Sequence, residues 1–195
     1  MLAALLNTLS THFTNILIFS FFGIATLGYY SLVQRVLGIP SVLIGNSIGQ
    51  VFFQEAIKEK QRTGKFINSF KATLKKLIII ALPFFTILFF IIEDLFVLVF
   101  GKDWLIAGLY AKILLPLFMI RFIVSPLTIA NQVNLKNKLG MKWQFGLLFL
   151  YIFILLISLY INLSFYNTLY LVVTLISFYY IYFLYLIYEH IKRKE

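Results

Sequence analysis

The chain has 195 residues, of which 62% are hydrophobic and only 12% are charged, whereas a soluble domain is about 25% charged. A chain of this length buries roughly 70% of its surface on folding, which leaves too much apolar surface for a water-soluble fold. The net charge of +10 does not indicate a nucleic-acid-binding protein, because the cations lie between long apolar runs. We therefore expect one all-α transmembrane helix bundle over residues 1–195.

Six segments are long and apolar enough to cross about 30 Å of hydrocarbon as helices. The predicted spans cover residues 2–22, 26–55, 77–100, 105–135, 143–162 and 168–188. The last two spans are divided because residues 143–188 carry no formal charge over 46 residues, and one helix of that length would measure about 69 Å. A single crossing needs half of that, so a turn is expected near Asn162 to Asn167.

The loop cations predict the orientation, because short cytoplasmic loops are rich in Lys and Arg. The connections expected on one side contain Lys58, Lys60, Arg62, Lys65, Lys71, Lys75, Lys76, Lys136, Lys138, Lys142, Lys192, Arg193 and Lys194, whereas those expected on the other side contain only Lys102. This asymmetry predicts a multi-pass protein of the cytoplasmic (inner) membrane with a cytoplasmic C-terminus.

The basic loop at 58–76 also has an amphipathic pattern. Phe66, Ile67, Phe70 and Leu74 recur at helical spacing among its lysines. Such a segment favours a position along the cytoplasmic lipid headgroups.

Ionisable side chains inside the spans need a physical reason, since each costs at least about 2.5 kcal/mol at a helix centre. Arg35, Lys112 and Arg121 are the cations in question, and Glu93 and Asp94 are the carboxylates of the third span. Lys112 is predicted at a depth similar to Glu93, so it is either an ion-pair partner or a cavity residue. Arg121 is expected at mid-span with no carboxylate level with it, which favours a water-filled cavity or an anionic ligand.

Polar residues also share helix faces. Asn7 and Thr11 lie one helical turn apart in the first span, and Asn46 and Gln50 do so in the second. Such residues either join helices by hydrogen bonds or line a cavity for a ligand.

Signals for an enzyme are absent from the sequence. There is no cysteine, no paired-histidine zinc motif, no phosphate-binding glycine loop and no nucleophile elbow. The adjacent Glu93 and Asp94 point about 100° apart on a helix and do not converge on a metal. We expect neither catalysis nor a metal or other cofactor.

Two stretches resemble a known family. Residues 28–54 read GYYSLVQRVLGIPSVLIGNSIGQVFFQ, and residues 100–108 read FGKDWLIAG. With the basic loop, Pro83 and Pro126 in the family's order, they resemble the C-terminal lobe of Wzx-type polysaccharide-biosynthesis flippases of the multidrug/oligosaccharidyl-lipid/polysaccharide exporter superfamily.

The resemblance implies transport of an undecaprenyl-diphosphate-linked oligosaccharide across the cytoplasmic membrane, for surface polysaccharide such as capsule or the O-antigen of lipopolysaccharide. Family members have two similar lobes, so an N-terminal lobe is expected as a partner missing from this chain, beside membrane lipid. The diphosphate is expected at Arg35 and Arg121, with Lys112 third. The sugars are expected on the polar faces, and ion coupling at Glu93 and Asp94.

Other functions remain as alternatives. One is a MATE-like drug or cation exporter half, whose cavity would favour acidic residues. A second is a non-catalytic membrane subunit of polysaccharide assembly, which requires the intramembrane cations to pair within the protein. A membrane-embedded glycosyltransferase would need a larger external loop than this chain offers.

Overall fold

The computed structural model describes residues 2–133 and 137–192, with side chains described from residue 12 onward except at 40, 137 and 138. The elements in chain order are α1 (Leu2–Thr63), α2 (Ile67–Phe100), the 3-10 helix η1 (Lys102–Trp104), α3 (Leu105–Leu127), α4 (Ala130–Val133), α5 (Asn137–Tyr160) and α6 (Phe165–Lys192). No strand occurs in the described part, and five of its helices are long and apolar enough to cross a membrane. The predicted all-α transmembrane fold is therefore confirmed.

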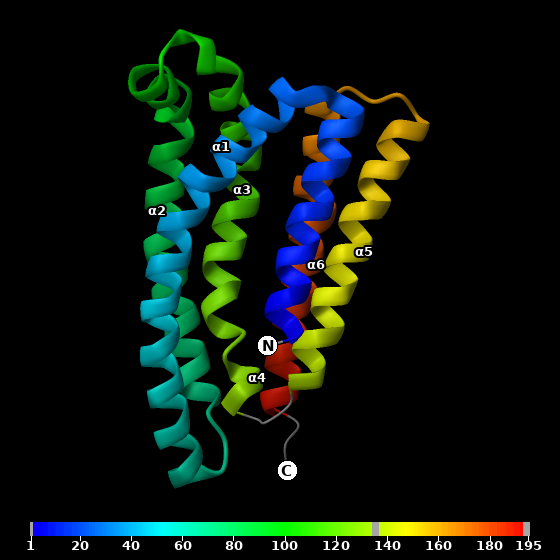
Figure 1. Cartoon of the computed structure of the whole chain (residues 1–195). Coiled ribbons are helices and arrows are strands. Elements are labelled where there is room, and N and C mark those ends of the chain that lie inside the picture. The colour runs from blue at the N-terminus through cyan, green and yellow to red at the C-terminus, as the bar shows by residue number, and fades with distance from the viewer. Residues whose placement is uncertain (1, 134–136, 193–195) are drawn as a thin grey trace.

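Helix α1 consists of two arms that meet at Gly23. This glycine has φ 85° and ψ 168°, a backbone conformation that a residue with a side chain rarely adopts. The arms, residues 2–22 and 24–63, run in opposite directions, and the second arm leads away from the kink toward the turn into α2 (Figure 1). The break expected after residue 22 is thus present.

The basic segment 58–76 differs from the loop expected there. Helix α1 continues to Thr63 and α2 begins at Ile67, with a short turn at Gly64 between them. The carboxylate of Glu59 accepts hydrogen bonds from the first backbone N–H groups of α2, from Asn68 at 3.1 Å and from Ser69 at 2.7 Å. The carboxylate thus takes the place of an N-cap side chain, and both helices extend through the basic segment.

The apolar side chains of this amphipathic segment pack α1 and α2 together. Phe66 and Phe70 are buried, and their rings lie 6.4 and 6.2 Å from the ring of Phe52 on α1. The aromatic residues therefore face the bundle. The position of this segment along the lipid headgroups stays a prediction. Lys60 also joins this end of α1 to α4, because its ammonium donates to the carbonyl of Val133 at 2.6 Å.

Helix α3 lies at the centre and packs against α1, α2 and α6. It ends at Leu127, earlier than the predicted span to residue 135. Pro126 has no N–H to donate and disrupts the helical hydrogen-bond ladder, and Thr128 instead closes a tight turn on the carbonyl of Ser125. The last two residues of the predicted span, 134 and 135, lie outside the described residues.

Helices α5 and α6 form an antiparallel pair joined by residues 161–164. Asn162 occupies the left-handed region with φ 57°, which asparagine tolerates better than most residues. The predicted division of the long uncharged segment is confirmed. Figure 1 shows that α6 ends at the same end of the bundle at which α1 begins, and large apolar side chains such as Leu98 and Phe90 are exposed on the outside.

Candidate functional site

A pocket of about 580 Å³ lies along the second arm of α1 and the second half of α3. Its lining comes from residues 34–46 of α1, from residues 118–126 of α3, and from Thr128 and Ile129, which follow α3. This volume falls in the range of small-molecule binding sites. The two helices pack closely here, because a Cβ at Gly45 would be in ordinary van der Waals contact with the ring of Pro126, at 3.5 Å.

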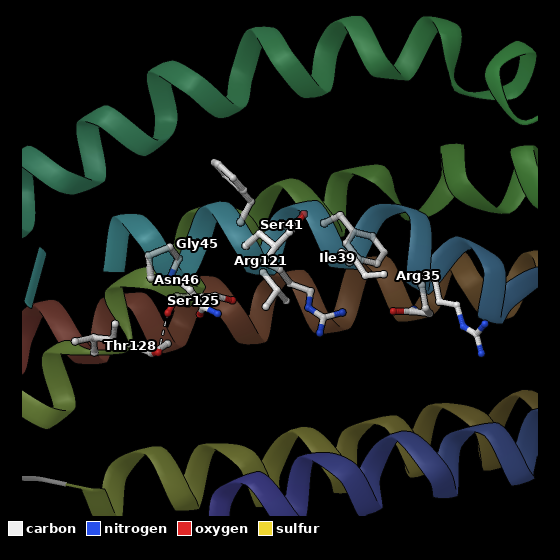
Figure 2. Close-up of a pocket in the computed structure, with 16 residues that line it drawn as sticks. Arg35, Ile39, Ser41, Gly45, Asn46, Arg121, Ser125 and Thr128 are labelled. Atoms are coloured by element: carbon white, nitrogen blue, oxygen red, sulfur yellow. Dashed lines mark hydrogen bonds between the residues drawn. The ribbon is translucent and has the colours of Figure 1, made fainter. Parts of the chain in front are cut away.

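The structure brings two of the predicted cations to this pocket. Arg35 reaches it from α1 and Arg121 from α3, and Figure 2 shows both guanidinium groups extending to the same side of the two helices. Within the described part of the chain, neither arginine forms an ion pair with a carboxylate. Arg121 lies over aromatic rings instead, 5.4 Å from Phe118 and 5.9 Å from Tyr180.

The pocket continues from the arginines toward hydroxyl and amide groups. At one end of the pocket in Figure 2 lie Asn46 of α1, Ser125 of α3 and Thr128, the residue that follows α3. Arg35 lies at the other end. The Thr128 hydroxyl donates to the carbonyl of Ser125 at 2.7 Å, so its oxygen remains available as an acceptor. The site therefore offers cationic donors at one end and neutral polar groups at the other.

Lys112 is placed apart from this pocket. Its ammonium lies 2.7 Å from the carboxylate of Glu93 on α2 and 5.2 Å from the ring centroid of Phe89. Of the two alternatives for Lys112, the structure thus displays the ion pair, and the pocket lining does not include this lysine. The neighbouring Asp94 is exposed. A role of Glu93 and Asp94 in ion coupling stays a prediction.

The remaining predicted residues are those of the two polar helix faces. Gln50, one turn beyond Asn46, is exposed and does not line the pocket. Asn7 and Thr11 belong to the first arm of α1, but their side chains lie outside the described residues. The prediction of a polar lining at these two positions stays a prediction.

Sequence reasoning missed several pocket residues, of which Ser125 and Thr128 could have been found. They follow Arg121 at i+4 and i+7 and so share its helix face. On α1, Ser41 follows Gln34 at i+7 in the same way, and both line the pocket. The tyrosine near Arg121 had no such signal, because Tyr180 comes from a different helix.

These features define a multi-pass α-helical membrane protein with a cation-lined pocket between two of its helices. The model of the polysaccharide biosynthesis protein family matches residues 1–109, more than half of the chain. The chain therefore belongs to that family and has a role in polysaccharide biosynthesis. The match includes residues 28–54 and 100–108, so the resemblance drawn from them is confirmed at the level of the family. Neither the curated proteins nor the solved structures gave a match.

Proposed function

We propose that this chain takes part in moving lipid-linked oligosaccharides across the cytoplasmic membrane, with a lipid diphosphate bound between Arg35 and Arg121. The observation that carries the proposal is the pairing of these two arginines in one pocket without a carboxylate partner among the described residues. The position of the pocket between membrane-length helices supports it.

The positive charge of the pocket favours a negatively charged ligand. A guanidinium group held among apolar helices is costly unless water or an anion compensates its charge. A diphosphate offers oxygens that accept paired hydrogen bonds from the planar fork of arginine. The same cations would repel a cationic drug, so the pocket favours a flippase over a drug or cation exporter.

The other groups of the pocket suit the remaining parts of such a lipid. Asn46, Ser125 and Thr128 supply donors and acceptors for sugar hydroxyls. Ile39 and Leu43 of α1 also line the pocket and are themselves 59% and 64% exposed. Their apolar surface would let the isoprenoid chain remain in the surrounding lipid while the headgroup is bound.

The orientation proposed is the one predicted from the loop cations. The α1–α2 turn and the end of α6 would face the cytoplasm, because both carry lysines and the opposite connection through η1 carries few charges. A reporter that is active only in the cytoplasm, fused after Glu195, checks this orientation. A second lobe is proposed to cover the pocket during transport.

The proposal is tested in cells whose surface polysaccharide depends on this protein. Arg35→Gln and Arg121→Gln should each abolish surface polysaccharide and cause the lipid-linked precursor to accumulate, because the headgroup loses a charge-assisted partner. The matched control is Lys102→Gln, which removes one exposed positive charge outside the pocket. Normal surface polysaccharide in both arginine variants, at normal protein levels, would refute the proposal.

A further inference from the structure

Tyr180 of α6 contacts the cation of the pocket without lining the pocket itself. The Arg121 guanidinium carbon lies 5.9 Å from the centroid of the Tyr180 ring. Phe118, one turn before Arg121 on α3, places a second ring at 5.4 Å. Arg121 therefore contacts aromatic rings from two helices.

The packing of α5 against α6 fixes the Tyr180 ring. Tyr180 is only 4% exposed, and its ring meets Trp143 of α5 edge to face at 5.1 Å. Trp143 in turn stacks on Phe183, one turn further along α6, at 4.5 Å. Such offset and edge contacts define ring positions within a core. Tyr180 is thus a rigid support for Arg121 that α6 contributes.

The groups around Arg121 are neutral. No carboxylate forms an ion pair with the guanidinium in the described ranges, and the rings that contact it, those of Phe118 and Tyr180, are uncharged. Aromatic faces attract a cation through the charge distribution of the ring. They leave its formal charge uncompensated, so it remains available to an anion.

We propose that Tyr180 is a positioning residue that holds the Arg121 guanidinium in place for an anionic lipid headgroup. The inference rests on the proposed function of the pocket and deepens it. Helices α5 and α6 contribute no side chain to the pocket lining. Under this proposal they nevertheless determine the position of the Arg121 guanidinium. A cation held in place in advance binds its ligand with a smaller loss of conformational freedom.

The test measures binding of farnesyl diphosphate to the purified chain in detergent micelles, with farnesol as the uncharged reference. Tyr180→Leu removes the ring, so affinity for farnesyl diphosphate should fall about fivefold, the effect of one cation–π contact. Affinity for farnesol should stay within twofold. The matched control is Tyr182→Leu, because Tyr182 lies on the same helix but is 57% exposed; it should bind like the wild type.

A second background separates positioning from general stability. In an Arg121→Gln protein the same Tyr180→Leu change should alter affinity less than twofold, because the group that Tyr180 positions is absent. A fivefold loss in both backgrounds, or wild-type affinity in the Tyr180→Leu protein, would overturn the inference. If Arg121→Gln alone binds like the wild type, the proposed function of the pocket fails instead.

A variant of the arginine covers the case in which Tyr180→Leu does not fold. Arg121→Lys keeps the charge but loses the planar group that contacts the rings. Its affinity for farnesyl diphosphate should fall about fivefold as well. Wild-type affinity in that variant would show that charge alone suffices and that the aromatic support is not needed.

Discussion

The ionisable side chains of the membrane-length helices fall into two groups, those with and those without a partner of opposite charge. Lys112 and Glu93 compensate each other at 2.7 Å, between α3 and α2. Arg35 and Arg121 have no carboxylate partner in the described part of the chain, and both face the pocket. The first arrangement stabilises the contact between two helices, whereas the second keeps positive charge available for a ligand.

This difference predicts how the Lys112–Glu93 pair responds to substitution. Lys112→Met leaves the Glu93 carboxylate alone among apolar helices, so it should destabilise the protein by about 2 kcal/mol. Adding Glu93→Leu removes the stranded charge and should recover most of the loss. Thermal unfolding in detergent measures both effects. Equal midpoints for the wild type, the single variant and the double variant would contradict this account of the pair.

At the residue scale, the sequence indicates which side chains are unusual but not what they contact. The cost of a charge inside a span singles out Arg35, Arg121 and Lys112 alike. Only the position of α2 beside α3 assigns Lys112 to Glu93. In the same way, no spacing along the chain could place Tyr180 beside Arg121, because 59 residues and a change of helix separate them.

Among the elements, α2 and α3 make a close contact at Gly108. A Cβ there would lie 3.1 Å from the Cα of Glu93 and 3.3 Å from its carbonyl oxygen. These are backbone atoms of a helix and cannot move aside as the end of a side chain can. Small residues of this kind let membrane helices approach each other, and here the approach also brings the helices that carry Lys112 and Glu93 together.

The contact predicts different effects of adding one methyl group at two glycines. Gly108→Ala should lower the free energy of unfolding by about 1–3 kcal/mol, because α2 and α3 must separate to admit it. Gly28→Ala is the matched control, since nothing lies within 4 Å of a Cβ there, and alanine favours a helix by up to about 1 kcal/mol. The two midpoints are compared by thermal unfolding in detergent. A Gly108→Ala protein as stable as the Gly28→Ala protein would refute the close approach.

At the element scale, turns with a local chemical cause were predictable. Gly23 breaks α1 because its backbone conformation suits glycine, and the change of direction at residues 161–164 follows from the length of the uncharged segment. The basic segment 58–76 was not predictable as two long helices. Its charges indicate a polar connection outside the hydrocarbon core of the membrane. The Glu59 cap and the burial of Phe70 depend on the three-dimensional packing, so the sequence does not reveal them.

In the whole molecule, the two halves of the chain contribute differently to the site. The residues that match the family model, 1–109, supply the α1 side of the pocket with Arg35 and Asn46. The later residues supply Arg121 on α3 and its support on α6. The pocket therefore depends on the packing of α3 between α1 and α6, which the family resemblance alone did not describe.

The central claim is that the two arginines together recognise a diphosphate attached to a lipid. Its most direct test compares the binding of farnesyl diphosphate, farnesol and inorganic pyrophosphate to the wild type and to an Arg35→Gln/Arg121→Gln double variant. The wild type should bind farnesyl diphosphate at least about tenfold more tightly than either of the other two, since charge-assisted hydrogen bonds and apolar contacts both contribute. The double variant should bind farnesyl diphosphate no better than farnesol; a double variant that keeps the wild-type preference would contradict the claim.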